Sequence, residues 1–108
     1  MNKELKNEII DSMVTSILAE LVSTYTDKDP LDIGLELDEL VPVLKGVDFQ
    51  GDIEEAIYNV WDNAYDNVVC GDGEYWMEEY GLYGEEVEAV LDGNVENKIV
   101  KKVVKLLK

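Results

Sequence analysis

The sequence contains no arginine and no histidine among its 108 residues. Histidine is the usual general base at neutral pH and the commonest metal ligand, and arginine supplies the bidentate clamp for phosphate groups. Without them, catalytic triads, zinc sites and arginine-assisted phosphoryl transfer are excluded or disfavoured. We therefore expect a protein that is not an enzyme and has no catalytic residue, cofactor or metal site.

The chain also lacks a pair of cysteines and a long apolar run. Its single cysteine, Cys70, can form no internal disulfide, and a membrane-spanning helix needs about 20 mainly apolar residues. The N-terminal stretch MNKELKNEII mixes charged and apolar residues where a secretory signal would have an apolar segment. These features predict a soluble cytoplasmic protein without a membrane partner.

Acidic residues, in contrast, are abundant and unevenly distributed. The chain has 25 Asp and Glu against nine Lys, for a net charge of −16. Residues 7–97 hold 24 of the acids and only two lysines, Lys28 and Lys45, which gives −22, whereas residues 98–108 hold five lysines and no acid. A net charge of magnitude about 2–8 keeps a small domain soluble, so this excess favours a further role for the acids.

Apolar residues recur at helical spacing along most of the chain. Residues 3–23, residues 52–69 and a final segment from about Val95 each place their apolar side chains on one helical face. In residues 52–69, Asp52 and Glu55 resemble a capping box at the helix start. With 46% hydrophobic residues, a chain of this length can bury one core. The sequence predicts an all-α fold: a compact single-domain bundle of about five helices over residues 1–108.

Shorter segments complete this prediction. Asp29 followed by Pro30 is a helix-start signal, and residues 74–80 and 85–91 read as short helices between glycine-containing turns. Residues 31–37 alternate like a strand but also continue into a helical stripe. We expect a helix there because no partner strand is evident, with a short extended segment as the alternative.

Pro42 follows within this region. A proline in a helix interior removes a backbone hydrogen bond and crowds the preceding turn. We expect Pro42 to kink or restart the helix.

Carboxylates are the remaining source of chemistry, and no motif organises them. A pair of acids can hydrolyse glycosides, but among 25 acids some pair will always have suitable spacing. A calcium-binding EF-hand needs oxygen ligands at loop positions 1, 3 and 5, glycine at 6 and glutamate at 12, and no window supplies that series. Only weak divalent-cation binding by bare charge is expected.

The acids outside the predicted core suggest binding of a basic surface. Helical side chains at i and i+4 lie about 6 Å apart, comparable with neighbouring phosphates on a nucleic-acid strand. Asp62 and Asp66 have this spacing, and Glu55 lies seven residues before Asp62 on the same helix edge. The predicted partner-binding residues are Glu54, Glu55, Tyr58, Asp62, Asp66, Asp72, Glu74, Tyr75, Glu78, Glu79, Glu85 and Glu88. The competing interpretation is an ordinary solvated helix face.

Aromatic residues are the expected anchors of such an interface, since charges steer a partner more than they hold it. Tyr58 and Tyr75 are expected to be exposed. Trp76, Tyr80 and Tyr83 are expected to form a core stripe, because they lie at i, i+4 and i+7. Cys70 is expected to be a buried or half-buried thiol without a role, because no cationic neighbour stabilises a thiolate.

The lysine-rich end of the chain has three interpretations. Its cations can complement the helix dipole and cover apolar surface, can pair with the acidic body, or can bind a membrane or nucleic acid. We expect the first. A body at −22 is repelled by anionic lipid and phosphate, which disfavours direct binding to nucleic acid.

In composition, length and helicity the chain is similar to phage and mobile-element proteins that mimic DNA to block restriction enzymes or CRISPR effectors, and to acidic immunity proteins that cap nuclease toxins. This resemblance covers charge and size and includes no alignable motif. It implies an inhibitor whose anionic helical face occupies the basic nucleic-acid-binding cleft of a nuclease or of a CRISPR or restriction effector. The alternative is a helical adaptor whose acidity serves solubility and whose aromatic residues form a homodimer interface.

Overall fold

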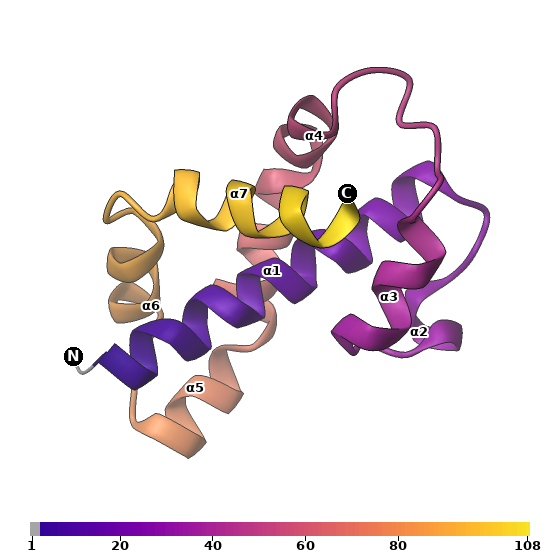
Figure 1. The fold of residues 1–108 in the computed structure, drawn as a ribbon. Coiled ribbons are helices and arrows are strands. Elements are labelled where there is room, and N and C mark those ends of the chain that lie inside the picture. Colours follow the sequence, from indigo (N-terminus) through magenta and orange to yellow (C-terminus); the bar gives the residue numbers. More distant parts are fainter. Residues whose placement is uncertain (1–2) are drawn as a thin grey trace.

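The computed structural model describes residues 3–108, which form seven α-helices, one π-helical turn and no strand (Figure 1). In chain order the elements are α1 (Lys3–Tyr25), α2 (Pro30–Ile33), α3 (Leu37–Leu44), α4 (Ile53–Asp66), the π-helical turn η1 (Asn67–Gly71), α5 (Gly73–Tyr80), α6 (Gly84–Leu91) and α7 (Glu96–Leu107). The predicted all-α class is confirmed. The helices outnumber the five expected, partly because residues 30–44 form two helices.

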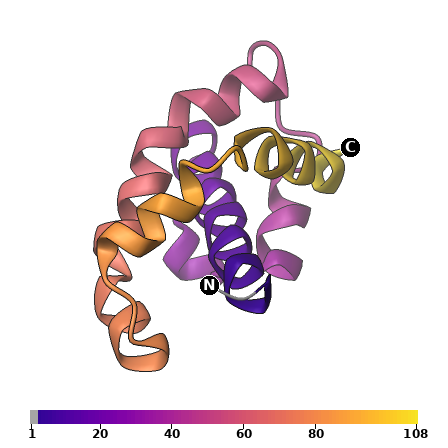
Figure 2. The same cartoon turned by 90° about the vertical axis from the view of Figure 1, so that its left-hand side faces the viewer.

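Helix α1 runs through the middle of the molecule. Its apolar face is fully buried and consists of Ile9, Ile10, Met13, Val14, Ile17, Leu18, Leu21 and Val22. Helices α3, α4, α6 and α7 and the turn η1 pack against it, and Figure 2 shows α1 obliquely from its N-terminal end among these neighbours. The radius of gyration is 13.6 Å, close to the roughly 13 Å expected for a compact chain of this size.

The segment after α1 forms two short helices in place of one. The Asp29 carboxylate accepts a hydrogen bond from the Leu31 backbone N–H at 2.9 Å and so caps α2. Helix α2 ends after one turn at Gly34, whose φ of +115° is rarely adopted by residues with a side chain. The expected restart of the helix at Pro42 was wrong, because the break lies at Gly34 and α3 continues through Pro42.

Helix α4 matches its predicted face and continues into an unpredicted π-helical turn. The Asp52 carboxylate caps the helix by accepting from the Glu54 N–H at 3.2 Å, in place of the N–H of Glu55 that a capping box uses. The turn η1 closes with a bond of 2.9 Å from the Asp72 N–H to the Asn67 carbonyl. Val68 and Val69 of η1 are buried, and Cys70 is exposed. The expected burial of Cys70 was therefore wrong, because the two valines of η1 occupy the core side of this turn.

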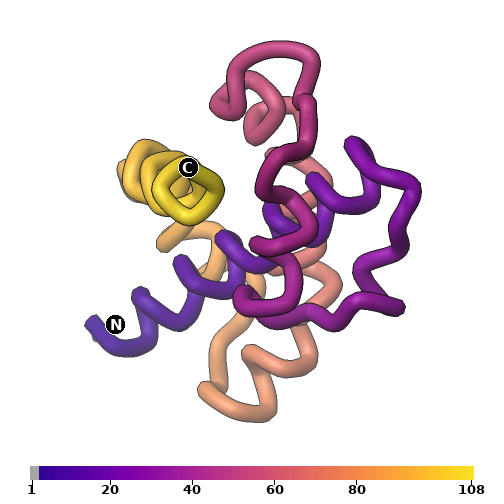
Figure 3. Tube along the Cα trace, turned by 45° about the vertical axis from the view of Figure 1, so that its right-hand side comes forward, coloured from indigo at the N-terminus to yellow at the C-terminus, as the bar shows by residue number. Residues whose placement is uncertain are grey.

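Helix α5 projects from one end of the molecule. Figure 3, in which α7 is seen almost end-on, shows α5 at the foot of the molecule and far from α7. Trp76 fixes α5 to η1: its indole N–H donates to the Val68 carbonyl at 2.9 Å, and its side chain is 1% exposed. The predicted core stripe was wrong for Tyr80 and Tyr83, which are 41% and 63% exposed.

The reason lies at the end of α5. Gly81 adopts a φ of +65°, and the Leu82 N–H returns to the Trp76 carbonyl at 3.1 Å. The helix therefore ends before Tyr83, and the buried position is taken by Leu82. No helix within residues 3–108 is long and apolar enough to cross a membrane.

Candidate functional site

The acidic side chains lie at the surface of the molecule. All 25 acids fall within residues 3–108, and all are exposed except Glu20, which is half-buried. The described core contains no buried polar or charged side chain. The folded protein therefore presents nearly all of its negative charge to solvent or to a partner.

Very little of this charge is neutralised within the molecule. Among the described residues one ion pair is formed, with the Lys102 Nζ 2.8 Å from the Asp11 Oδ1. Pairs at such exposed positions contribute about 0–1 kcal/mol to stability. Internal pairing therefore accounts for little of the acidic excess.

The predicted edge of α4 is present. Glu55, Tyr58, Asp62 and Asp66 follow one another at three- and four-residue steps, and all four are exposed because Ala56, Ile57, Val60 and Ala64 turn the opposite face into the core. Tyr58 is 47% exposed, as expected, and its ring lies 6.5 Å from that of Trp61. From Glu55 to Asp66 the edge is about 16 Å long at 1.5 Å per residue.

Tyr65 connects this edge to α6. Its hydroxyl donates to the Asp92 Oδ1 at 3.3 Å. The pKa of Tyr65 is raised to about 12, mostly by burial and then by the carboxylates of Asp92, Glu88 and Asp66 in that order of decreasing effect. A phenolate is disfavoured among like charges. The structure thus brings the predicted residues Asp66 and Glu88 together around one phenol, although they belong to different helices.

A second group of predicted residues surrounds the aromatic side chains of α5. Tyr75, which is 46% exposed as expected, lies with its ring 5.0 Å from Trp76 and 6.0 Å from Tyr80 in edge-on contacts. A hydrogen bond with Tyr75 raises the pKa of Tyr80, and burial and the carboxylates of Glu8 and Glu79 contribute in the same direction. Tyr80 therefore lies within electrostatic reach of Glu8 of α1, and neither of these two residues was among the predicted site residues.

The other predicted residues are more dispersed. Glu54 lies at the start of α4, and Glu74, Glu78 and Glu85 are exposed on α5 and α6 without a hydrogen bond or ion pair from their side chains within residues 3–108. Asp72, between η1 and α5, lines a groove against α1. The twelve residues are therefore spread over α4, the junction of η1 and α5, α5 itself and α6, and carboxylates from separate helices lie near Tyr65 and near Tyr80.

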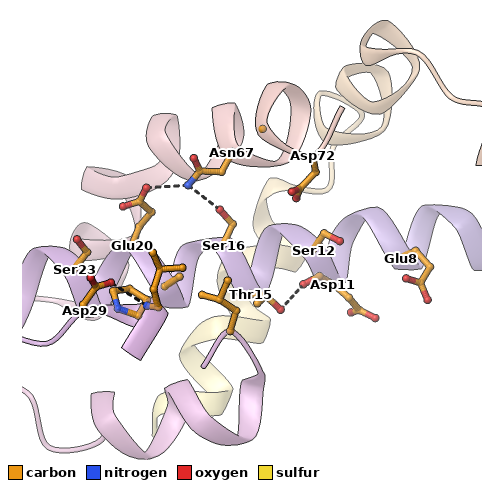
Figure 4. Close-up of a pocket in the computed structure, with 15 residues that line it drawn as sticks. Glu8, Asp11, Ser12, Thr15, Ser16, Glu20, Ser23, Asp29, Asn67 and Asp72 are labelled. Carbon is orange, nitrogen blue, oxygen red and sulfur yellow. Dashed lines mark hydrogen bonds between the residues drawn. The ribbon is translucent and has the colours of Figure 1, made fainter. Parts of the chain in front are cut away.

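That groove was missed by sequence analysis. It has a volume of about 780 Å³ and lies between α1, α2 and η1 (Figure 4). Four of its five carboxylates were not among the predicted site residues: Glu8, Asp11, Glu20 and Asp29. A signal for the first three was present, because they share the polar face of α1 opposite the core. Nothing in the sequence indicated which elements would stand beside that face.

Five of the nine lysines lie on α7 or directly after it. Ile99, Val103 and Leu107 of α7 are buried, and Lys98, Lys101, Lys102, Lys105 and Lys108 are all exposed. Lys102 pairs with Asp11, so pairing with the acidic body occurs, and Lys105 lies in the last turn of α7, where a cation complements the helix dipole. No lysine lines the groove.

No three Asp, Glu or Cys side chains within residues 3–108 are placed to share a metal ion. Cys70 is exposed in η1 without a neighbouring lysine in sequence. What the arrangement provides is a large anionic surface with exposed tyrosines.

Comparisons with known proteins add no relative: no protein-family model, no curated protein and no solved structure matches this chain.

Proposed function

We propose that this protein is a non-enzymatic cytoplasmic inhibitor that imitates a nucleic-acid strand and occupies the basic cleft of a nucleic-acid-binding protein. The observation that carries the proposal is the exposure of nearly all 25 acids together with a single ion pair among the described residues. Such a surface retains its charge for a cationic partner. A rigid anionic surface associates rapidly with a basic cleft, and the association weakens as salt rises.

The α4 edge is the part of the surface best suited to imitate phosphates. Its acids are held at helical spacing on a well-packed helix, and Asp66 is joined by Glu88 near Tyr65. The half-exposed rings of Tyr58 and Tyr75 supply anchors that charge alone does not. A nuclease, a restriction enzyme or a CRISPR effector are partners of the required chemistry, and a nuclease toxin is the alternative.

The test is capture of the partner from host lysate on the immobilised protein at low salt, followed by elution with increasing salt. A matched pair of variants makes the result specific. One reverses the edge through Glu55→Lys, Asp62→Lys and Asp66→Lys, and the other makes the same change in net charge through Asp27→Lys, Asp38→Lys and Glu96→Lys.

We expect the edge variant to lose affinity for the captured nucleic-acid-binding protein by about a hundredfold, because juxtaposed like charges cost several kcal/mol. The control variant should lose much less. Circular dichroism should show unchanged helicity in both. If both variants bind like the parent, or if the captured proteins do not bind nucleic acid, the α4 edge is not a nucleic-acid mimic.

A further inference from the structure

The groove along α1 is lined by five of the acidic side chains. Its floor is the polar face of α1, and its walls are α2 with the following loop on one side and η1 on the other (Figure 4). The floor runs from Glu8 to Ser23, which is about 22 Å at 1.5 Å per residue. A partner segment of about seven extended residues, or about four helical turns, matches this length.

Negative charge and small polar groups line the floor. The lining residues include Ser12, Thr15, Ser16 and Ser23 beside the carboxylates of Glu8, Asp11, Glu20, Asp29 and Asp72. The small side chains let a partner approach α1 closely.

Two of the five carboxylates are uncommitted. Asp11 pairs with Lys102, Asp29 caps α2, and Glu20 accepts from the Asn67 Nδ2 at 2.9 Å. Glu8 and Asp72, at the end of the groove nearest α5, have no side-chain hydrogen bond or ion pair among the residues described. Burial raises the pKa of Asp72, so its ionised form would gain from an added cation.

The wall formed by α2 and the loop after it, which faces η1 across the groove, carries exposed apolar side chains. Leu31 is 77% exposed and Leu35 is 50% exposed, and both line the groove with Pro30. Single exposed leucines are common on protein surfaces, but these two stand together beside an anionic floor. The groove therefore combines one apolar wall with carboxylates, and the ammonium of Lys102 is paired with Asp11 of its lining.

We propose that this groove binds a basic segment of the partner protein, with lysine or arginine side chains on Glu8 and Asp72 and an apolar side chain against Leu31 and Leu35. This inference rests on the proposed function and identifies a second contact in addition to the α4 edge. Charge complementarity favours this occupant. A nucleic acid would be repelled, and no three metal-ligating side chains within the described residues are placed to hold a metal ion.

The test uses a fluorescein-labelled peptide of alternating leucine and arginine, with a leucine–glutamate peptide as the negative control. Fluorescence anisotropy measures its affinity for the parent protein, for Glu8→Lys with Asp72→Lys, and for a charge-matched control, Asp38→Lys with Glu96→Lys. We expect the groove variant to bind at least about tenfold more weakly than the control, which corresponds to about 1.4 kcal/mol. Equal losses in both variants would overturn the proposal.

The apolar wall has its own test at constant charge. Leu31→Ser with Leu35→Ser should weaken binding of the leucine–arginine peptide severalfold and leave binding of a serine–arginine peptide unchanged. Equal effects on both peptides would contradict a role for the two leucines. A nitroxide on the peptide should broaden the backbone amide signals of Ser12, Ser16 and Asp72, and broadening confined to α4 would also contradict the proposal.

Failure of this inference can be separated from failure of the proposed function. Suppose that the intact partner is captured, that DNA competes with this protein for the partner, and that Glu8→Lys with Asp72→Lys leaves the affinity unchanged. The groove is then not a contact of the partner, and the proposed function remains. If the peptide occupies the groove while no nucleic-acid-binding partner is captured, the groove assignment is supported and the proposed function fails.

Discussion

At the residue scale, the molecule separates its apolar and ionised side chains almost completely. The described core has no polar member, and acids from different helices meet only at the surface, as around Tyr65. There the phenol is partly shielded from water and faces Asp92, Glu88 and Asp66, each of which disfavours ionisation of the hydroxyl. Tyr65 is therefore a local reporter of how closely these carboxylates approach one another.

We predict that the free energy of unfolding decreases as the pH rises from 10 to about 12. The pKa of Tyr65 in the folded protein is about 12, above its ordinary value of 10.0, so the folded state retains a proton that the unfolded chain releases. The contribution of the Tyr65 hydroxyl to the free energy of unfolding is fully present below pH 10 and is lost as the pH rises from 10 to about 12. Denaturant titrations at several pH values measure it.

Two variants make this prediction specific. Asp92→Asn should lower the pKa of Tyr65, observed as phenolate absorbance, because it removes the nearest negative charge and keeps a hydrogen-bond acceptor. Tyr65→Phe should remove this part of the pH dependence. An unchanged alkaline decrease of stability in Tyr65→Phe would show that other groups cause it.

At the element scale, short helices depend on their ends more than on their length. Helix α5 has eight residues, and an isolated helix of that length is unstable in water. Trp76 binds it to η1, and Gly81 terminates it in a left-handed conformation. The exposed tyrosines of α5 therefore depend on these two residues for their positions.

Substitution of the two glycines that bound α5 should have opposite effects. Gly81→Ala should destabilise the protein by about 1 kcal/mol, because φ is +65° there. Gly73→Ala should stabilise it by about 0.5 kcal/mol, since its φ is not positive and no atom lies within 4 Å of the added methyl group. Urea unfolding curves compare the two variants, and equal effects would contradict the role assigned to Gly81.

Periodicity predicted the long elements well and the short breaks poorly. The buried and exposed faces of α1 and α4 follow from apolar spacing alone, because each buries one continuous stripe. The break at Gly34 and the π-helical turn depend on how neighbouring segments close, which local spacing does not encode. Local spacing fails for Tyr83 for the same reason. Tyr83 lies seven residues after Trp76, but α5 ends at Gly81, so Tyr83 is not on the buried face of that helix.

At the scale of the whole molecule, the main feature is the uneven distribution of charged residues. Helix α7, which carries four lysines, lies apart from α5, which carries three acids, as Figures 1 and 3 both show for the two helices. The candidate site was predictable only where it follows one helix, as along α4. The groove unites Glu8, Asp29 and Asp72 from three separate segments, and only the folded chain brings them together.

We predict that added salt stabilises the free protein. A net charge of −16 with one ion pair among the described residues implies self-repulsion in the folded state, which salt screens. The Tm should rise by several degrees between about 50 and 200 mM NaCl. The α4 edge variant, with a net charge of −10, should show a smaller rise. A Tm that falls over this range would show that attractive ion pairs outweigh the repulsion.

The central claim is that the carboxylate surface takes the place of a nucleic acid in the partner's cleft, and competition tests it most directly. The affinity of the protein for its captured partner should be measured with increasing concentrations of the duplex DNA or RNA that the partner binds. The account predicts mutual exclusion, with apparent affinity falling in proportion to added nucleic acid. A ternary complex in which protein and nucleic acid bind the partner together at full affinity would contradict it.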